Sequence, residues 1–185
     1  MFFYVLQVAL AWLYSHLLEY LLHRYILHKP QRKKWFKTHF AEHHRSARRY
    51  LMLDTKYFGL PPISGDPEIK GLIFLGFLHL PIVFFWPLAY CVLILSSVSY
   101  YFQHRWQHQS MEYARNNTPW HYDHHMGPDQ HKNWGVRLPI FDWVFGTRKV
   151  YKGSKRERIK FVLHRQKLER EVNEIRSRRR SDQKP

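Results

Sequence analysis

The chain has almost no capacity for covalent cross-linking and none of the common cofactor-binding motifs. Its one cysteine, Cys91, lies inside an apolar run, which excludes an intrachain disulfide and a secreted disulfide framework. A Walker loop, a Gly-x-Gly-x-x-Gly dinucleotide fingerprint and a Gly-x-Ser-x-Gly nucleophile elbow are all missing. The sequence therefore predicts neither a nucleotide-binding protein nor a serine hydrolase of the elbow type.

Acidic residues are also scarce. The 185 residues include 14 Asp and Glu against 30 Lys and Arg, which gives a formal net charge of +16. Charge alone supports only non-specific attraction to nucleic acids, and no nucleic-acid-binding motif accompanies it. We therefore expect no specific nucleic-acid partner.

Charge is missing above all from two long apolar stretches that could meet a membrane. The first covers residues 1–22, is interrupted by His16 and Glu19, and has the length of one spanning helix. The second, residues 71–103, contains no Asp, Glu, Lys or Arg but two interrupting prolines. Because proline breaks helices, we expect a hairpin bent near residues 81–87. Its arms, about 15 residues or roughly 22 Å each, are either re-entrant or span a locally thinned bilayer.

Histidine, by contrast, is abundant and gathered into four short boxes. The boxes are HRYILH at 23–28, HFAEHH at 39–44, HRWQH at 104–108 and HYDHH at 121–125. Residues three or four apart share a helix face, so a box can direct two or three ring nitrogens to one point. The pair in the first box, five residues apart, diverges more. A lone histidine is more often an ordinary polar side chain, but four boxes favour a metal site.

The number of boxed histidines predicts two metal ions. Ten imidazoles are too many for one ion, whereas two ions with about five nitrogens each fit the count. The predicted ligands are His23, His28, His39, His43, His44, His104, His108, His121, His124 and His125. Imidazole suits iron, zinc and copper alike, so the ligands alone do not name the metal. The Glu-x-x-His pattern of soluble di-iron bundles is missing.

The boxes HX4H, HX3HH, HX3H and HX2HH, in this order, resemble the fatty acid hydroxylase/sterol desaturase superfamily of membrane oxygenases. The stretch NWGVRLPIFDWVFGT at 133–147 is similar to the family's Asn-aromatic-Gly step and Phe-Gly-Thr ending. The resemblance covers roughly residues 1–150. One departure is the second box, which has three spacers where many hydroxylases have two, and this puts the subfamily in doubt more than the chemistry.

The resemblance implies two irons as the cofactor and O₂ as a co-substrate, with zinc as a substitute acquired during purification. The implied reaction is hydroxylation or desaturation of a fatty acyl or sterol-like lipid. Electrons must come from an external electron-transfer partner, because the chain has no flavin or haem module. One alternative is a carotenoid-type hydroxylase, which uses similar boxes. An alternative of another class is a non-catalytic zinc-binding membrane protein, although structural zinc sites favour cysteine.

The metal site also sets the expected topology. All boxes must lie on one side of the membrane, so the chain between His44 and His104 crosses it an even number of times. Five Lys and Arg residues follow the first span between Arg24 and Lys34, and the positive-inside rule then places the boxes in the cytosol and the N-terminus outside. The predicted fold is all-α: one N-terminal span and a Pro-bent apolar hairpin, with a cytosolic helical cap that holds the dimetal histidine site.

Polar residues beside the boxes could support the ligands. A ligating histidine usually passes its other N–H to a carboxylate or a carbonyl. The candidates are Glu19, Glu42, Asp123, His131, Asn133 and Asp142. Each is equally well explained as a surface or capping group, and His131 is in addition a candidate eleventh ligand or proton carrier.

Past Thr147 the composition shifts towards Lys and Arg. We therefore divide the chain into a hydroxylase-like membrane domain, 1–150, and a basic amphipathic C-terminal helix and tail, 151–185. The basic face could lie against anionic lipid headgroups. A solvated charged helix explains the same pattern.

Overall fold

The computed structural model describes residues 1–59 and 65–181. Contacts divide the chain into two compact units, Met1–Val150 and Tyr151–Pro185. The described residues form helices and loops and contain no strand, which confirms the all-α class.

The first unit is a succession of helices of very different lengths. They are α1 Phe2–Leu22, π-helix η1 His23–Leu27, 3₁₀-helix η2 Pro30–Arg32, α2 Lys33–Phe36, π-helix η3 Lys37–His43, α3 His44–Arg49, 3₁₀-helix η4 Thr55–Tyr57, α4 Pro67–Leu78, 3₁₀-helix η5 Leu80–Phe84, α5 Pro87–Gln109, α6 Met111–Asn117, α7 Pro119–Met126 and α8 Ile140–Val144. The second unit contains α9 Lys155–Ser181, and residues 182–185 of the predicted tail lie outside the described residues.

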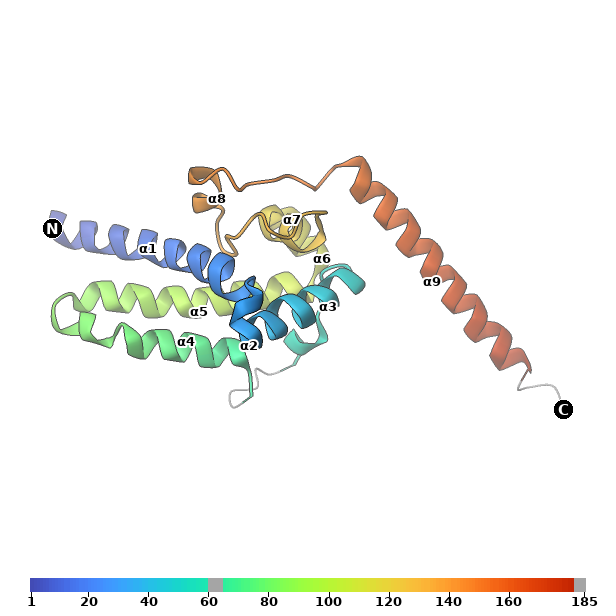
Figure 1. Ribbon diagram of the computed structural model, residues 1–185, viewed down its shortest axis with the longest axis horizontal. Helices are drawn as coiled ribbons and strands as arrows, with labels where there is room; N and C mark the ends of the chain where they lie inside the picture. The colour runs from blue at the N-terminus through green and yellow to red at the C-terminus, as the bar shows by residue number, and fades with distance from the viewer. Residues whose placement is uncertain (60–64, 182–185) are drawn as a thin grey trace. The chain divides into compact units, whose positions relative to one another are not determined.

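Three helices lie side by side, with the histidine boxes at one end of the bundle. In Figure 1, α1 and α5 run in the same direction and α4 runs opposite to them, with α5 packed against both. Among the described residues, the segment Phe2–Leu27 is the one helix long and apolar enough to cross a membrane. Because α1 and α5 share a direction, boxes one and three come together at the same end of the bundle.

The apolar stretch bends where the prolines predict. The chain turns through η5, which contains Pro81, and resumes at Pro87 as the first residue of α5. The two arms differ from the expected equal lengths, since α4 has 12 residues and α5 has 23. The reason is local: Asp66 caps α4 by accepting a hydrogen bond from the Glu68 N–H, whereas α5 continues past the apolar run to carry the third box.

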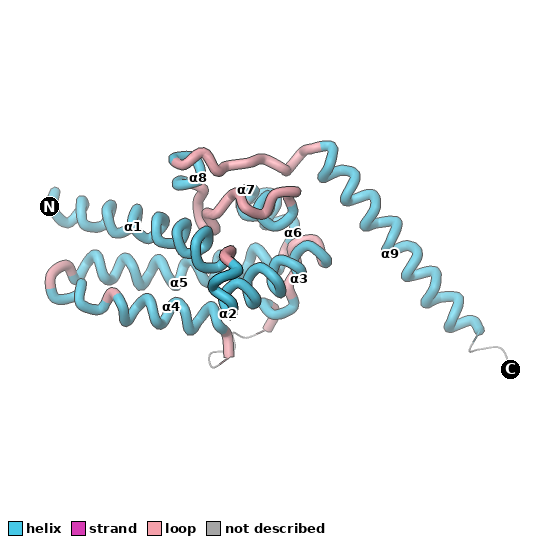
Figure 2. Tube along the Cα trace, in the orientation of Figure 1, coloured by secondary structure: helices cyan, strands magenta, loops and turns pink. Residues whose placement is uncertain are grey.

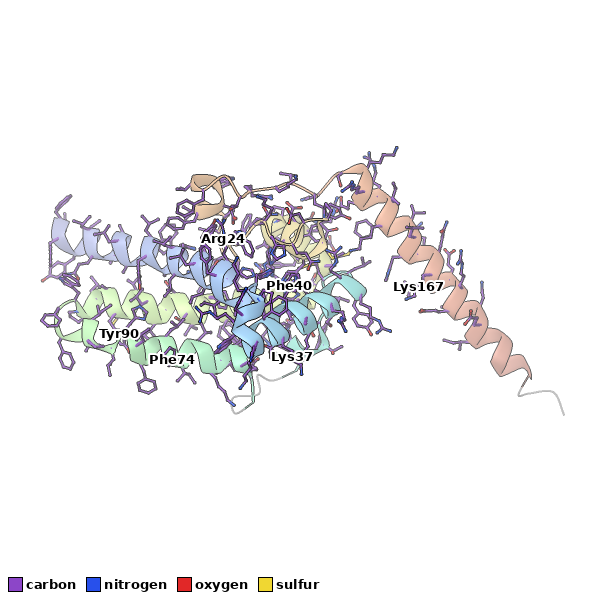
Figure 3. All side chains as sticks on the ribbon, viewed as in Figure 1. Arg24, Lys37, Phe40, Phe74, Tyr90 and Lys167 are labelled. Carbon is purple, nitrogen blue, oxygen red and sulfur yellow. The ribbon has the colours of Figure 1, made fainter. Side chains whose placement is uncertain are left out.

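Burial is concentrated at the histidine end of the bundle. Eight of the ten boxed histidines, including all three of α7, are at most 2% exposed. The outer surface of α1, α4 and α5 instead carries exposed apolar side chains, among them Phe74 at 63% (Figure 3). Helix α7 carries box four, and the loop before α8 (Figure 2) contacts boxes one and four through the Trp134 and Lys132 carbonyls.

Candidate metal centre

Boxes one and two lie on π-helices, η1 and η3. In a π-helix the backbone bonds connect residues i and i+5, so residues five apart lie on one side. This explains why His23 and His28 converge, with ring centroids 5.0 Å apart, and why His39 and His44 do the same at 5.0 Å. An ordinary α-helix would turn these pairs away from each other.

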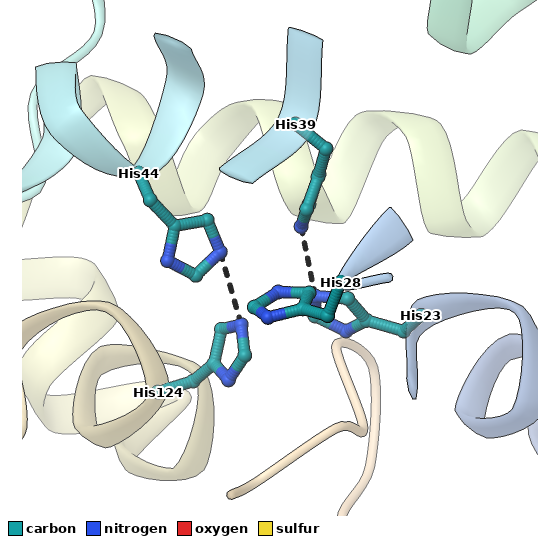
Figure 4. A group of neighbouring side chains, drawn as sticks. All are labelled: His23, His28, His39, His44 and His124. Carbon is teal, nitrogen blue, oxygen red and sulfur yellow. Dashed lines mark hydrogen bonds between the residues drawn. The ribbon is translucent and has the colours of Figure 1, made fainter. Parts of the chain in front are cut away.

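The structure brings nine of the ten predicted ligands into two groups. The five-histidine group consists of His23, His28, His39, His44 and His124. Figure 4 shows its rings turned towards one another, with His23 Nε2 2.9 Å from His39 Nε2 and His124 Nε2 3.1 Å from His44 Nε2. Each of these residues offers one ring nitrogen within 4.8 Å of the others.

The second set, which we call the four-histidine group, consists of His43, His104, His108 and His125. His121 belongs to neither group, but its Nε2 lies 3.1 Å from His108 Nε2. The two groups adjoin, because the rings of His44 and His125 are 4.1 Å apart. Boxes two and four are therefore divided between the groups, whereas box one serves the first and box three the second.

The nitrogen spacing fits metal coordination. Two nitrogens bound to one ion at right angles, with bonds of about 2.1 Å, lie roughly 3 Å apart, which matches the 2.9–3.1 Å between the Nε2 atoms. Several buried ring nitrogens among the described histidines also have no hydrogen-bond partner, namely both nitrogens of His28 and His125 and the Nε2 atoms of His43 and His104. This geometry gives two adjacent histidine groups, each of which could hold a metal ion.

The other ring nitrogen of most of these histidines is held by the protein. His23, His108 and His124 donate from Nδ1 to backbone carbonyls, those of Trp134, Met52 and Lys132 respectively. The Nδ1 atoms of His43 and His104 donate to carboxylates, at 2.9 Å to Asp54 and 2.6 Å to Glu68. His44 Nδ1 lies 2.8 Å from the Gln130 amide. The bonds to the carbonyls and carboxylates select the tautomer that leaves Nε2 free to bind a metal.

Burial makes the rings suited to binding cations rather than protons. It lowers the pKa of His43, His44 and His124 well below the ordinary histidine value, and repulsion from neighbouring imidazoles lowers it further. Burial alone would raise the pKa of Glu68, but the adjacent His104 imidazole outweighs it and brings that pKa down to about 2. At neutral pH the imidazoles of His43, His44 and His124 are therefore neutral donors, and Glu68 is a carboxylate.

The carboxylates next to the rings are Asp54 and Glu68, which the sequence analysis does not single out. Asp54 lies 11 residues beyond His43 and Glu68 lies 36 residues before His104, so neither is part of a box. No local pattern could have found them, because chain folding alone brings them to the histidines.

The residues predicted to support the ligands lie around the centre in other roles. Glu19 accepts bonds from the Val136 and Arg137 N–H groups and from Arg137 Nε. Asp123 pairs with Arg148 at 2.7 Å. His131 is exposed and stacks on Phe40, 5.6 Å from the His28 ring.

The other candidates order the chain after the last box. Asn133, in the left-handed region at φ 61°, accepts from the Lys149 N–H and donates to the Lys149 carbonyl. Asp142 accepts from the Trp134 and Gly135 N–H groups and from Thr147 Oγ1. Glu42 forms an exposed pair with Lys37. The 133–147 motif thus places the Trp134 carbonyl against His23.

Gly135 is expected to tolerate no side chain. A Cβ there would overlap the carbonyl oxygen of Leu138, so Gly135→Ala must displace backbone and is expected to cost about 1–3 kcal/mol. Thermal unfolding of the purified protein in detergent measures this. Gly65→Ala is the matched control because a Cβ at Gly65 meets nothing within 4 Å. Equal stability of the two variants would contradict the close approach at Gly135.

A cavity of about 370 Å³ opens beside the centre. Its lining includes His23, His39, His43 and His104, and its walls between α1, α4 and α5 are mostly apolar. His79 also lines it, held by Tyr14 at 2.9 Å. His79 is 11 residues beyond Glu68, or roughly 16 Å along α4 at 1.5 Å per residue. Tyr100, the first of three consecutive aromatic residues shortly before box three, is also part of the lining.

Comparison with known families now adds to the geometry. Comparison with curated proteins and with solved structures gives no match. The model of the fatty acid hydroxylase family matches residues 8–147, which include all four boxes and the 133–147 motif. With its two adjacent histidine groups and the full set of boxes, the chain belongs to the fatty acid hydroxylase family.

Proposed function

We propose that the protein is an O₂-dependent membrane-lipid oxidoreductase with a histidine-ligated di-iron centre. The observation that carries the proposal is the opening of both histidine groups onto one apolar cavity: His23 and His39 of the first group and His43 and His104 of the second line it. A substrate held in this cavity would have a C–H bond beside both histidine groups.

The ten boxed histidines would hold the two irons, with His121 completing the set of the four-histidine group. Redox metal ions and O₂ together supply the oxidising power to break an unactivated C–H bond, which acid–base side chains lack. The chain's own residues bind the ions, hold each ring in one tautomer and exclude water by burial. Hydroxylation and desaturation use the same oxidant and differ in the placement of the substrate carbon.

The cavity favours a substrate with an extended apolar segment. Leu72, Leu75 and Ile94 are among its apolar lining residues, and four boxed histidines are among its polar ones. We propose a fatty acyl or sterol-like lipid with the reacting carbon beside the histidines. Electrons would come from a separate redox protein on the cytosolic side.

We further propose a multi-pass topology with the histidines facing the cytosol and the N-terminus outside. Exposed apolar side chains along α1 and the α4–α5 hairpin support contact with lipid. Helix α4, with 12 residues or roughly 18 Å, is too short to cross a hydrocarbon core of about 30 Å. The α4–α5 hairpin would therefore make its two passes through a locally thinned bilayer, with both of its ends on the histidine side.

The direct test uses full-length protein purified anaerobically with iron supplied. Metal analysis should give about two irons per chain, and the chemically reduced protein should add oxygen to, or remove hydrogen from, a component of a lipid extract when given O₂. Mass spectrometry identifies the product. Tight zinc that iron cannot replace, with every lipid unchanged, would instead establish the structural-zinc alternative.

Filling the cavity should reduce lipid turnover without removing metal. Gly71 lines the cavity, and a Cβ there meets only the Trp35 ring at 3.7 Å. Gly71→Leu is expected to lower kcat/KM by about 10–100-fold, the effect of a misfitted pocket, and to retain two metals. Gly65→Leu, on open surface, is the control. Full turnover in Gly71→Leu would show that the substrate binds elsewhere.

A further inference from the structure

The two histidine groups differ in the charge of the residues that contact the Nδ1 atoms of their rings. In the four-histidine group, two of four Nδ1 atoms donate to carboxylates: His43 to Asp54 and His104 to Glu68. Both carboxylates are well covered, with side chains 8% and 12% exposed. A carboxylate that accepts a bond from Nδ1 raises the basicity of the ring and strengthens its bond to a metal.

The Nδ1 partners found for the five-histidine group are neutral. His23 and His124 donate to the carbonyls of Trp134 and Lys132, and His44 lies against the Gln130 amide. A metal on His44 Nε2 requires the amide oxygen to accept the Nδ1 proton. Neutral acceptors orient the rings without adding negative charge.

Nearby cations do not cancel the difference. Lys56 lies close enough to lower the pKa of His43, and Arg48 does the same to His44. Each group therefore has at least one neighbouring cation. The four-histidine group has in addition two carboxylates hydrogen-bonded directly to its rings. Interactions across such short distances in a buried site are stronger than those with partly exposed cations.

We propose that the two metal sites are inequivalent and that Asp54 and Glu68, as positioning residues, make the four-histidine site the tighter one. The inference rests on the proposed dimetal centre. It predicts that a metal-free protein fills the four-histidine site first and that the five-histidine site exchanges its metal more readily. Because His121 completes the four-histidine group in the proposed centre, the number of rings favours neither site.

The test is a stepwise titration of the full-length metal-free protein with Co²⁺ against a competing chelator, under anaerobic conditions and in detergent. Cobalt absorption and bound metal report two steps. Asp54→Asn and Glu68→Gln keep size and hydrogen-bonding capacity and are expected to weaken the tighter step by about 10–100-fold. Gln130→Glu should tighten the weaker step, because it gives His44 a carboxylate partner.

Two further variants assign the steps without relying on the carboxylates. His125→Ala should remove the tighter step and His28→Ala the weaker one. Two equal steps in the unchanged protein, or carboxamide variants that leave the tighter step unaltered, would overturn the inference while leaving the dimetal proposal standing. Failure to bind two ions at all would overturn both.

Discussion

Replacing His44 by alanine is expected to remove one of two metals and to reduce lipid oxidation by roughly a thousandfold or more, because groups that act as a unit lose most of their activity together. His44 is 1% exposed and lies between the groups, with its ring 4.6 Å from His124 and 4.1 Å from His125. Its loss disturbs both sites. Metal analysis and lipid turnover on the same preparation measure the two effects together.

The matched control is His164→Ala, because His164 lies on α9 in the second unit. That variant should keep two metals and full turnover. A His44→Ala protein with two tightly held metals and unreduced turnover would exclude His44 as a ligand. Circular dichroism of both variants separates loss of metal from loss of fold.

Removing the carboxylate of Glu19 is expected to destabilise the protein by about 3–5 kcal/mol, because it leaves a buried cation without its partner. Arg137 donates from Nε to Glu19 Oε2 at 2.7 Å and from Nη2 to Ser15 Oγ. Both side chains of the Glu19–Arg137 pair are buried. Glu19 also accepts from two backbone N–H groups. The ion pair connects α1 to the loop that contains Arg137 and Trp134, and the Trp134 carbonyl of this loop accepts the hydrogen bond from His23 Nδ1.

Unfolding of Glu19→Ala in detergent, followed by circular dichroism, measures this effect. Glu42→Ala is the control, since Glu42 is 57% exposed in a 3.9 Å pair with Lys37 and should change stability by about 0.5 kcal/mol or less. The double change Glu19→Ala with Arg137→Met should recover much of the loss. If Glu19→Ala alone is as stable as the control, the pair does not hold α1 to the loop.

The sequence was sufficient for the all-α class, the bend near Pro81 and the family. Box spacing and the helix-breaking effect of proline are local properties of the chain, so the periodicity and composition of the sequence are enough to predict these three features. The gathering of nine boxed histidines into two groups also agrees with the expected pair of metals. The assignment of each ligand stays a prediction that metal analysis must test.

What the sequence could not provide is the sorting of rings and their partners. Box spacing assumes α-helices, but η1 and η3 are π-helices, so His39 joins His44 rather than His43 in the five-histidine group. Asp54 and Glu68 lie outside the boxes, Asp54 in the loop before η4 and Glu68 on α4. The Glu68–His104 contact depends on the packing of α4 against α5, and the Asp54–His43 contact on the turn that follows α3, and box spacing encodes neither.

The π-helical turns have a consequence for how box lengths vary. A π-turn is an α-helical turn with one extra residue, so a pair five apart on η1 occupies the same relation as a pair four apart on α5. His23 and His28 are 5.0 Å apart between ring centroids, and His104 and His108 are 4.9 Å apart. A one-residue insertion between two histidines can therefore be absorbed by the helix while the two rings stay about 5 Å apart. Boxes with three and with four spacer residues can thus place their two histidine rings at the same separation.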